Sequence, residues 1–407
     1  MNKAYKIRLY PNKKQKELID NTIGCSRFLY NQMLNEHIHV YEKLKDNKIE
    51  LYSYKYKTEK EYKKEFEFLK NASSRALQQS NRDLNVAFQN FFKGIKKKQK
   101  VGFPKFKAKH KVKWSYRETQ LEKQQAIKIC FNKIQLNKLG FVSFRGLSKD
   151  FNGIIKSVTV TKNRDNTYEA SILVDQVFVL KKRISDNKIG CDLGIKEFLV
   201  CSNGDSFLGI KKELFEIEKE IKKQDRHLRR KIKGSNNYEK CRIKLAKKYK
   251  YKTNFQNHYF RHLAKKLCEE NQTVVLEDLN VSGMIKNRSV SHSIFYSGWS
   301  KFKTMLEQKA KEYDSEVKYV NRWFPSSKTC SKCGNIQKDL SLKDRIYICE
   351  CGNTIDRDLN ASINILKQHS SEYGENKCGE EIRPIEYNSN GIFYEAFNKG
   401  VEKFIFL

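Results

Sequence analysis

Four cysteines between residues 330 and 351 constrain the fold of this chain more tightly than any other feature. Cys330 and Cys333 form a C-x-x-C-G pair, and Cys349 and Cys351 form a C-x-C-G pair fifteen residues later. Four thiolates match the tetrahedral coordination of a structural Zn²⁺ and leave no open position for a substrate. We therefore expect these four residues to hold one zinc ion. The second pair has one intervening residue where two are usual, so we expect its turn to be distorted.

Two other interpretations of this cluster remain open. The four thiols could stay reduced in a loop, or one pair could be a redox site, although a single C-x-x-C would suffice for redox chemistry. The other cysteines are scattered along the chain, and its first residues, Met1–Gln15, resemble a strand rather than a signal peptide. Scattered thiols without a secretion signal are typical of a reducing compartment, so we expect a cytoplasmic protein.

The charge balance indicates a polyanionic partner. The chain has 82 lysines and arginines against 47 acidic residues, a formal net charge of +35 over 407 residues. Such an excess makes a compact state repel itself unless a partner screens it. A membrane surface would also serve, but no apolar segment approaches 18 residues. A hydrophobic fraction of 39% excludes a disordered chain, so we expect a protein of two or three domains that binds nucleic acid.

Hydrophobic periodicity divides the first half of the chain into helices followed by strands. AYKIRLYP alternates as a strand, and Asn12 is a candidate cap for the helix after it. The segment SSRALQQSNRDLNVAFQNFFKG predicts a second helix, with Gly94 as its stop. Residues 157–174 then alternate around an Asp165-Asn166 turn, which predicts a β-hairpin in an antiparallel sheet and a small barrel.

The second half continues with mixed elements. NKIGCDLGIKEFLVCSNGDSFLGI predicts another hairpin with a tight turn at Asn203-Gly204. A long basic helical region follows, with a break near Gly234. The apolar TVVLEDL predicts a strand, and apolar residues recur at helical spacing from Asp358 onward.

Three acidic residues occur at positions where a sheet edge can collect them. Asp192 ends one apolar strand, Glu277 ends another, and Asp358 begins a late helix. Three converging carboxylates would repel one another unless divalent cations neutralise them, and hard oxygen ligands suit Mg²⁺ or Mn²⁺. Two such ions about 3.5–4 Å apart can activate water and stabilise the leaving oxygen of a phosphodiester. Asp278 and Asp356 could occupy the same positions, and each acid alone is a weak signal.

The sequence resembles the TnpB (OrfB) family of transposon-encoded proteins, which is related to the type V CRISPR effectors. The matching segments follow the family order over about residues 1–370. They are YKIRLYPNKKQKELIDNTIGCSRFLYN, ALQQSNRDLNVAFQNFFKG, VGFPKFK, IGCDLG, VVLEDLNVSGM, WFPSSKTCSKCGN and DRDLNASINI. The resemblance implies that Asp192, Glu277 and Asp358 form the metal-binding triad, with Asp358 in preference to Asp356. The one-residue spacing of the second cysteine pair departs from the commoner family pattern.

The resemblance also implies a multidomain α+β fold, with an RNase H-like (RuvC) nuclease domain, a zinc-ribbon insertion, a helical recognition lobe and a wedge-type β-barrel. The expected boundaries are 1–17 and 116–183 for the barrel, 18–115 for the lobe, 184–323 and 354–370 for the nuclease, and 324–353 for the insertion. We expect residues 371–407 to form a poorly ordered C-terminal tail.

Several cations are candidates for nucleic-acid contacts. GFPKFKAKHKVKWSYR interleaves aromatic residues with lysines, a pattern that favours base stacking together with charge, although a solvated strand over a core would look similar. Arg322 is a further phosphate-contact candidate. The full set of candidates is Lys105, Lys107, Lys113, Arg229, Arg230, Lys231, Lys233 and Arg322.

The family resemblance implies an RNA-guided DNA endonuclease of a transposon. It would use a guide RNA and cleave double-stranded DNA beside a short flanking motif at one Mg²⁺-dependent centre. The sequence leaves the oligomeric state open, and we favour a monomer. Three alternatives remain. They are a CRISPR effector of the same descent, a guided repressor without nuclease activity, and a strand-joining transposase. The order Asp, Glu, Asp differs from the Asp, Asp, Glu usual in such transposases.

Overall fold

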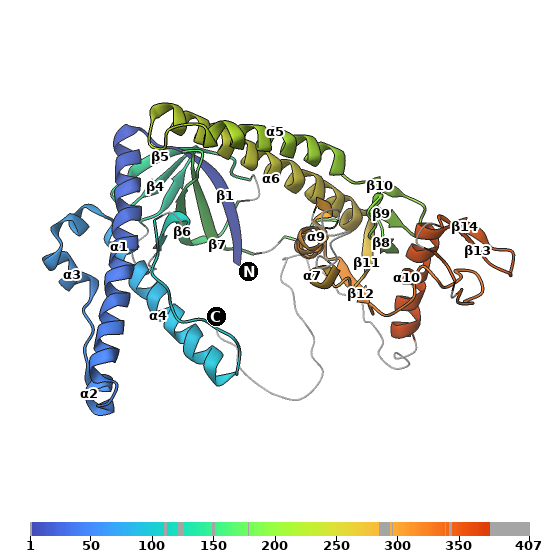
Figure 1. Cartoon of the computed structure of the whole chain (residues 1–407), viewed down its shortest axis with the longest axis horizontal. Coiled ribbons are helices and arrows are strands. Elements are labelled where there is room, and N and C mark those ends of the chain that lie inside the picture. The colour runs from blue at the N-terminus through green and yellow to red at the C-terminus, as the bar shows by residue number, and fades with distance from the viewer. Residues whose placement is uncertain are drawn as a thin grey trace, which may run out of the picture. The chain divides into compact units, whose positions relative to one another are not determined.

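The computed structural model describes residues 2–109, 112–120, 126–148, 151–177, 179–284, 294, 296–337, 339–341 and 344–374. The expected tail therefore lies outside the described residues from position 375 onward. The chain divides into two compact units, Met1–Lys181 with Ile210–Phe260 and Lys182–Gly209 with Arg261–Leu407 (Figure 1). Among the described residues, no helix combines the length and the hydropathy that a membrane crossing requires.

The first unit contains a seven-stranded antiparallel sheet in the order β2-β6-β7-β1-β5-β4-β3. Alternation along β1 buries Tyr5, Ile7 and Leu9 in a core that every one of the longer strands joins. The predicted Asp165-Asn166 turn connects β6 to β7, with Asn166 at φ +59°. The strands are β1 (Asn2–Tyr10), β2 (Trp114–Thr119), β3 (Lys128–Cys130), β4 (Lys133–Leu136), β5 (Gly140–Arg145), β6 (Ile154–Lys162) and β7 (Tyr168–Asp175).

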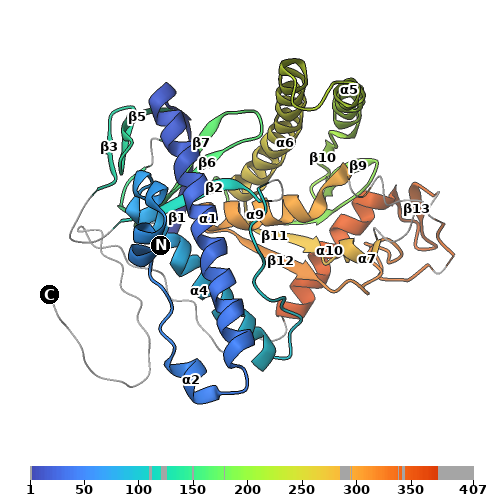
Figure 2. The ribbon, with the colours of Figure 1, turned by 60° about the vertical axis from the view of Figure 1, so that its left-hand side comes forward.

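Helices occupy most of residues 13–96 in this unit, and α1 and α4 pack against each other (Figure 2). Asn12 caps α1 as predicted, because its side chain accepts a hydrogen bond from the Gln15 backbone N–H and the Gln15 side chain accepts one from the Asn12 backbone N–H. The elements are α1 (Lys13–Leu44), α2 (Lys48–Ser53), α3 (Glu59–Glu65), η1 (Glu67–Asn71) and α4 (Ser74–Lys96).

The prediction that Gly94 stops α4 is wrong, because the helix continues to Lys96. A Cβ atom at Gly94 would lie 2.4 Å from the Val101 side chain. The glycine therefore serves close packing of the returning chain rather than helix termination.

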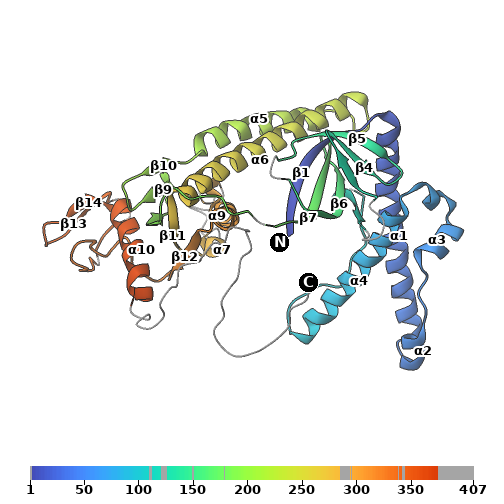
Figure 3. The ribbon, with the colours of Figure 1, turned by 180° about the vertical axis from the view of Figure 1, so that it is seen from behind.

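The basic region forms a helical hairpin of α5 (Lys211–Arg229) and α6 (Asn236–Glu270), which lie side by side in Figures 1 and 3. The predicted break falls at Gly234, where φ is +90°. Lys248 and Glu220 form an ion pair of 3.0 Å between the two helices, and Lys252 pairs with Glu218. The boundary between the two units falls within α6.

The second unit contains a five-stranded sheet in the order β10-β9-β8-β11-β12, in which β8, β11 and β12 are parallel. The Asn203-Gly204 turn connects β9 to β10, as predicted. The remaining elements are β8 (Asn187–Asp192), β9 (Glu197–Cys201), β10 (Ser206–Leu208), β11 (Asn271–Glu277), α7 (Val281–Met284), α9 (Trp299–Tyr313), β12 (Glu316–Val320), β13 (Ile346–Ile348), β14 (Thr354–Asp356) and α10 (Arg357–Gly374).

Helix α10 packs across this sheet because β8 has no side chain at Gly190. A Cβ atom there would lie 2.2 Å from the Ser362 carbonyl oxygen and 2.7 Å from the Leu366 backbone nitrogen, both on α10. Val275, Val320 and Ile365 form the core between the sheet and the helix. Gly190 thus sets how closely α10 approaches the strand that ends at Asp192.

We predict that Gly190→Ala destabilises the protein by about 1–3 kcal/mol, because the new methyl group must displace the α10 backbone. Thermal unfolding of the purified chain measures the change. Gly24→Ala in α1 is the matched control, since its Cβ would meet nothing within 4 Å and alanine favours a helix. Equal melting temperatures for Gly190→Ala and the wild type would contradict the prediction.

Candidate functional site

Two of the three predicted carboxylates leave the sheet at the same edge. Asp192 is the last residue of β8, and Glu277 is the last residue of β11. These strands are parallel neighbours, and Leu276 is paired with Cys191 in their register. Parallel strands bring their carboxyl ends to one edge, so the next residue of each strand, Glu277 and Asp192, lies at that edge.

The third carboxylate, Asp358, lies in the first turn of α10. The neighbouring Asp356 has another role, because its Oδ1 accepts hydrogen bonds from the backbone N–H groups of Asp358 and Leu359 at 2.9 and 3.0 Å. Asp356 therefore caps the helix. This leaves the Asp358 side chain, 20% exposed, to interact with Asp192.

Charge repulsion and burial act together on these acids. Burial raises the pKa of Asp192 to about 7, with further contributions from the charges of Asp358 and Glu277, while Arg357 opposes the shift. Burial also raises the pKa of Glu277, and the Lys303 ammonium opposes it. A site that collects partly buried negative charge in this way suits a divalent cation. Among the described residues, only the four cysteines between 330 and 351 form a group of three or more candidate ligands that could hold a metal ion in this arrangement, and the three carboxylates do not form such a group.

Three cations that the sequence reasoning missed surround the acids. Arg345 and Arg357 each have a guanidinium nitrogen 3.7 Å from an Asp358 carboxylate oxygen. Lys303 on α9 donates a hydrogen bond of 2.7 Å to the Glu277 backbone carbonyl. The position of Arg357 between two aspartates was a usable signal, whereas Arg345 and Lys303 are distant in sequence and gave none.

The other candidate acid at the β11 end, Asp278, forms an ion pair with Arg322. Both side chains are partly exposed, at 46% and 42%. Arg322, a predicted nucleic-acid contact, therefore lies directly beside the carboxylate edge and already has a protein partner.

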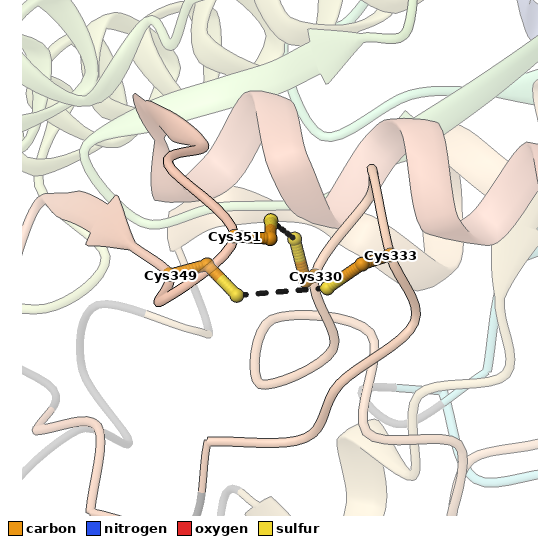
Figure 4. Close-up of side chains that lie close together, drawn as sticks. All are labelled: Cys330, Cys333, Cys349 and Cys351. Carbon is orange, nitrogen blue, oxygen red and sulfur yellow. Dashed lines mark hydrogen bonds between the residues drawn. The ribbon is translucent and has the colours of Figure 1, made fainter.

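The four predicted cysteines meet at one point (Figure 4). The sulfur atoms of Cys330 and Cys351 are 3.7 Å apart, those of Cys333 and Cys349 are 3.6 Å apart, and all four lie within 4.8 Å of one another. Tetrahedral coordination with Zn–S bonds of about 2.3 Å places sulfur atoms about 3.8 Å apart. The cluster could therefore bind one zinc ion, and its four residues come from the two predicted pairs.

Both cysteine turns close with the same pair of backbone hydrogen bonds. In the first, the Gly334 N–H donates to the Cys330 carbonyl and the Cys330 N–H donates to Asn335. In the second, the Gly352 N–H donates to Cys349 and the Cys349 N–H donates to Asn353. Both glycines have φ +80°. The second turn is one residue shorter, so its two closing bonds span three and four residues where those of the first span four and five.

Two asparagines of α10 connect this cluster to the carboxylate edge. Asn360 accepts a hydrogen bond from the Ser331 backbone at 2.9 Å and donates one to the Thr329 carbonyl at 2.7 Å. Asn364, one turn later, donates to the carbonyls of Thr329 and Ser326. Both side chains are buried. The helix that carries Asp358 is thereby fastened to the segment that carries Cys330.

The predicted nucleic-acid contacts divide into two groups. Arg229, Arg230, Lys231 and Lys233 are exposed at the turn between α5 and α6, where Arg229 also pairs with Asp225 at 2.8 Å. Residues 101–109 form no strand, so the alternative of a solvated strand is wrong for Lys105 and Lys107.

Lys107 is less free than expected, because its ammonium lies 3.7 Å from the centre of the Tyr30 ring. It nevertheless lines a hollow of about 850 Å³ that also contains Lys113. The other cations of this hollow are Arg27, Lys109, Arg117 and Lys162.

We predict that Asp192→Asn stabilises the metal-free protein more at pH 8 than at pH 5. Because the folded-state pKa of Asp192 is raised from 3.8 to about 7, ionisation removes stability as the pH rises through this range, and asparagine cannot ionise. Thermal unfolding in a chelator at both pH values measures the difference. The exposed Asp205→Asn is the control. An equal or opposite difference for Asp192→Asn would contradict the raised pKa.

We predict one zinc ion per purified chain, and its loss in Cys349→Ser. Removal of one thiolate leaves an incomplete tetrahedral set and weakens the site. Elemental analysis after dialysis measures the metal content. Cys130→Ser, a change to an exposed cysteine outside the cluster, should retain the full zinc content. A zinc-free wild-type protein that is otherwise stable would refute the assignment.

Three known protein families match successive segments of this chain. Residues 1–46 match the family described as a helix-turn-helix domain, residues 159–288 match the one described as "Probable transposase", and residues 299–365 match the Cas12f1-like TNB domain. In this chain, residues 2–46 form one strand, one long helix and the turn after it rather than a helix-turn-helix.

A Streptomyces pristinaespiralis protein named "Putative RNA-guided DNA endonuclease" is 31% identical over 94% of this chain and 92% of its own length. The Escherichia coli K12 protein "Putative RNA-guided DNA endonuclease InsQ" is 27% identical over 93% and 94%. A solved Cas12f1–sgRNA–target DNA complex is similar in fold, with a TM-score of 0.56 and 15% identity, covering 90% of this chain and 98% of that one. The chain therefore belongs to the TnpB (OrfB) family of transposon-encoded proteins, which is related to the type V CRISPR effectors.

Proposed function

We propose that this protein is an RNA-guided DNA endonuclease of a transposon, which cleaves double-stranded target DNA beside a short flanking motif. The observation that carries the proposal is the carboxylate edge formed by the ends of β8 and β11 and the first turn of α10. The relatives named as RNA-guided DNA endonucleases, which match almost the whole chain, support it.

In this proposal Asp192, Glu277 and Asp358 hold two Mg²⁺ or Mn²⁺ ions. The raised pKa values of Asp192 and Glu277 support a site that gains stability when cations neutralise it. When bound, the ions supply an activated water and stabilisation of the leaving oxygen of the phosphodiester. Asp192 must lose its proton to bind a cation, so we expect metal binding to strengthen as the pH rises through about 7.

The surrounding residues keep the acids in position. Asp356 and the α10 backbone fix the turn that presents Asp358, and Arg345 and Arg357 reduce the repulsion around it. Lys303 holds the Glu277 backbone. A structural Zn²⁺ would be bound by Cys330, Cys333, Cys349 and Cys351 and would stabilise an insertion that has little hydrophobic core of its own. Asn360 and Asn364 hold α10 in place through their hydrogen bonds to the segment that carries Cys330.

We assign residues 184–323 and 354–370 to an RNase H-like (RuvC) nuclease domain and 324–353 to its zinc-binding insertion. The order β10-β9-β8-β11-β12, a meander extended by two parallel strands, supports this assignment. Residues 1–17 and 116–183 are assigned to a wedge-type barrel, and the single hydrophobic core that the strands of the seven-stranded sheet share supports this assignment. Residues 18–115 are assigned to a recognition lobe.

The guide RNA and the target DNA would neutralise the net charge of +35. The basic hollow that contains Lys107 and Lys113 and the exposed cations at the α5–α6 turn are the proposed backbone contacts. Contacts of this kind bind phosphate without reading sequence, so the affinity for nucleic acid should fall steeply with salt.

The decisive experiment compares DNA cleavage by the wild-type complex and by Asp192→Ala in the presence of Mg²⁺. We expect cleavage to fall at least about a thousandfold, since the loss of a metal ligand removes the activated water, while the bound RNA is unchanged. Asp205→Asn is the matched control. Unaltered cleavage by Asp192→Ala would refute the assignment of the nuclease site.

Sequencing of the RNA that copurifies with the protein tests the guided mechanism separately. A discrete structured RNA with a variable 3′ end is the expected result. Random cellular RNA would contradict guidance, and strand joining without added guide would favour a transposase.

A further inference from the structure

The outer face of β1, β3, β4 and β5 carries an aromatic surface that the proposed nuclease chemistry does not use. Tyr10 and Phe141 are about half exposed, and Phe131 is fully exposed. The three side chains line a hollow of about 720 Å³ together with Lys133 and Arg145. We call this set the aromatic face. Single exposed aromatic residues are ordinary, but three that share one hollow indicate a binding surface.

The backbone conformation at Phe131 is unfavourable for a phenylalanine. Cys130 and Lys133 are paired across the β3–β4 hairpin, so Phe131 is the first residue of its two-residue turn. Its φ is +48°, in the left-handed region that glycine normally occupies in such turns. A bulky residue is disfavoured in this region because its Cβ atom lies too close to the following carbonyl oxygen. Glycine would fit the turn better, so protein folding does not explain the phenylalanine.

The cations of this face have no acidic partner among the described residues. Arg8, Lys128, Lys133 and Arg145 are exposed, and none forms an ion pair with any residue in the described ranges. Arg8 and Arg145 lie directly opposite each other in the sheet, an arrangement of like charges that is unfavourable without a counter-charge. Their guanidinium groups lie 5.7 and 5.8 Å from the centre of the Tyr10 ring.

The nearest acid in the register does not supply that counter-charge. Glu169 of β7 is paired with Arg8 across the sheet, but its carboxylate is bound by Lys6 at 2.6 Å and Lys250 at 2.5 Å. The aromatic face therefore combines the exposed rings of Phe131 and Phe141 with positive charge that no acidic side chain of the described residues compensates. Bases with free ring faces and negatively charged phosphates complement both properties.

We propose that the aromatic face binds an unpaired segment of the guide RNA, with bases stacked on Phe131 and Phe141 and phosphates bound by Arg145 and Lys133. The inference rests on the proposed RNA-guided function. A duplex hides its base faces in its own stack, so the exposed rings select an unpaired segment. The guide is favoured over double-stranded target DNA because a folded RNA presents unpaired loops and bulges whose bases can stack on aromatic side chains.

Phe131→Gly is the sharpest test, because it removes the ring while relieving the left-handed backbone strain. We expect its melting temperature to equal or exceed that of the wild type. We also expect its affinity for RNA extracted from the wild-type complex, and for a short oligouridylate, to fall about tenfold. Affinity for the same oligouridylate annealed to oligoadenylate should change less than twofold.

Two further variants define the face. Arg145→Gln should weaken both single-stranded and duplex probes and reduce the salt dependence of binding. Tyr41→Ala, which removes an exposed aromatic residue of α1 in the same unit, is the matched control and should leave affinity unchanged.

Unchanged affinity of Phe131→Gly for RNA would overturn the inference, as would an equal loss for single-stranded and duplex probes. A loss confined to single-stranded DNA would also overturn it, because the occupant would then be DNA. If the wild type copurifies with no discrete RNA, the proposed function itself fails, and this result is distinct from a failure of the aromatic face.

Discussion

The second unit must hold Asp192, Glu277 and Asp358 near one another against the mutual repulsion of their carboxylates. The parallel pairing of β8 with β11 brings two of the carboxylates to one edge, and α10 adds the third. Repulsion between them would favour separation. Burial raises the pKa of Asp192 to about 7, and the charges of Asp358 and Glu277 raise it further. The packing of α10 against the sheet opposes this separation. Divalent cations bound between the carboxylates would neutralise their charges and stabilise the arrangement.

The packing depends on what holds α10. Gly190 allows the helix backbone to lie against β8, and Asn360 and Asn364 bind the carbonyls and N–H groups of the cysteine-bearing segment. A bound zinc ion would therefore influence the proposed nuclease centre without contacting it, because it would fix the segment to which the helix is fastened. This arrangement gives a physical reason for the four cysteines to precede Asp358, the proposed metal ligand of α10, so closely in sequence.

The basic residues are distributed differently from Asp192, Glu277 and Asp358. The acids converge on one edge, whereas the cations line the hollow beside Lys107, the α5–α6 turn and the aromatic face of the first unit. A long polyanion contacts many phosphates at once, each worth little alone, so dispersed cations suit it. The aromatic face differs from the other basic surfaces because its rings offer stacking as well as charge.

Local sequence determined the features that depend on neighbouring residues. These include the Asn12 cap, the Asp165-Asn166 and Asn203-Gly204 turns, the break at Gly234 and the two cysteine pairs, each set by backbone preferences within a few positions. Tertiary structure alone decided the rest. The pairing of β8 with β11, the approach of Arg345 to Asp358 and the packing role of Gly94 join segments distant in the chain, and the strained turn at Phe131 runs against its residue's own preference. Such contacts arise from packing of the whole core, and local propensity carries no record of them.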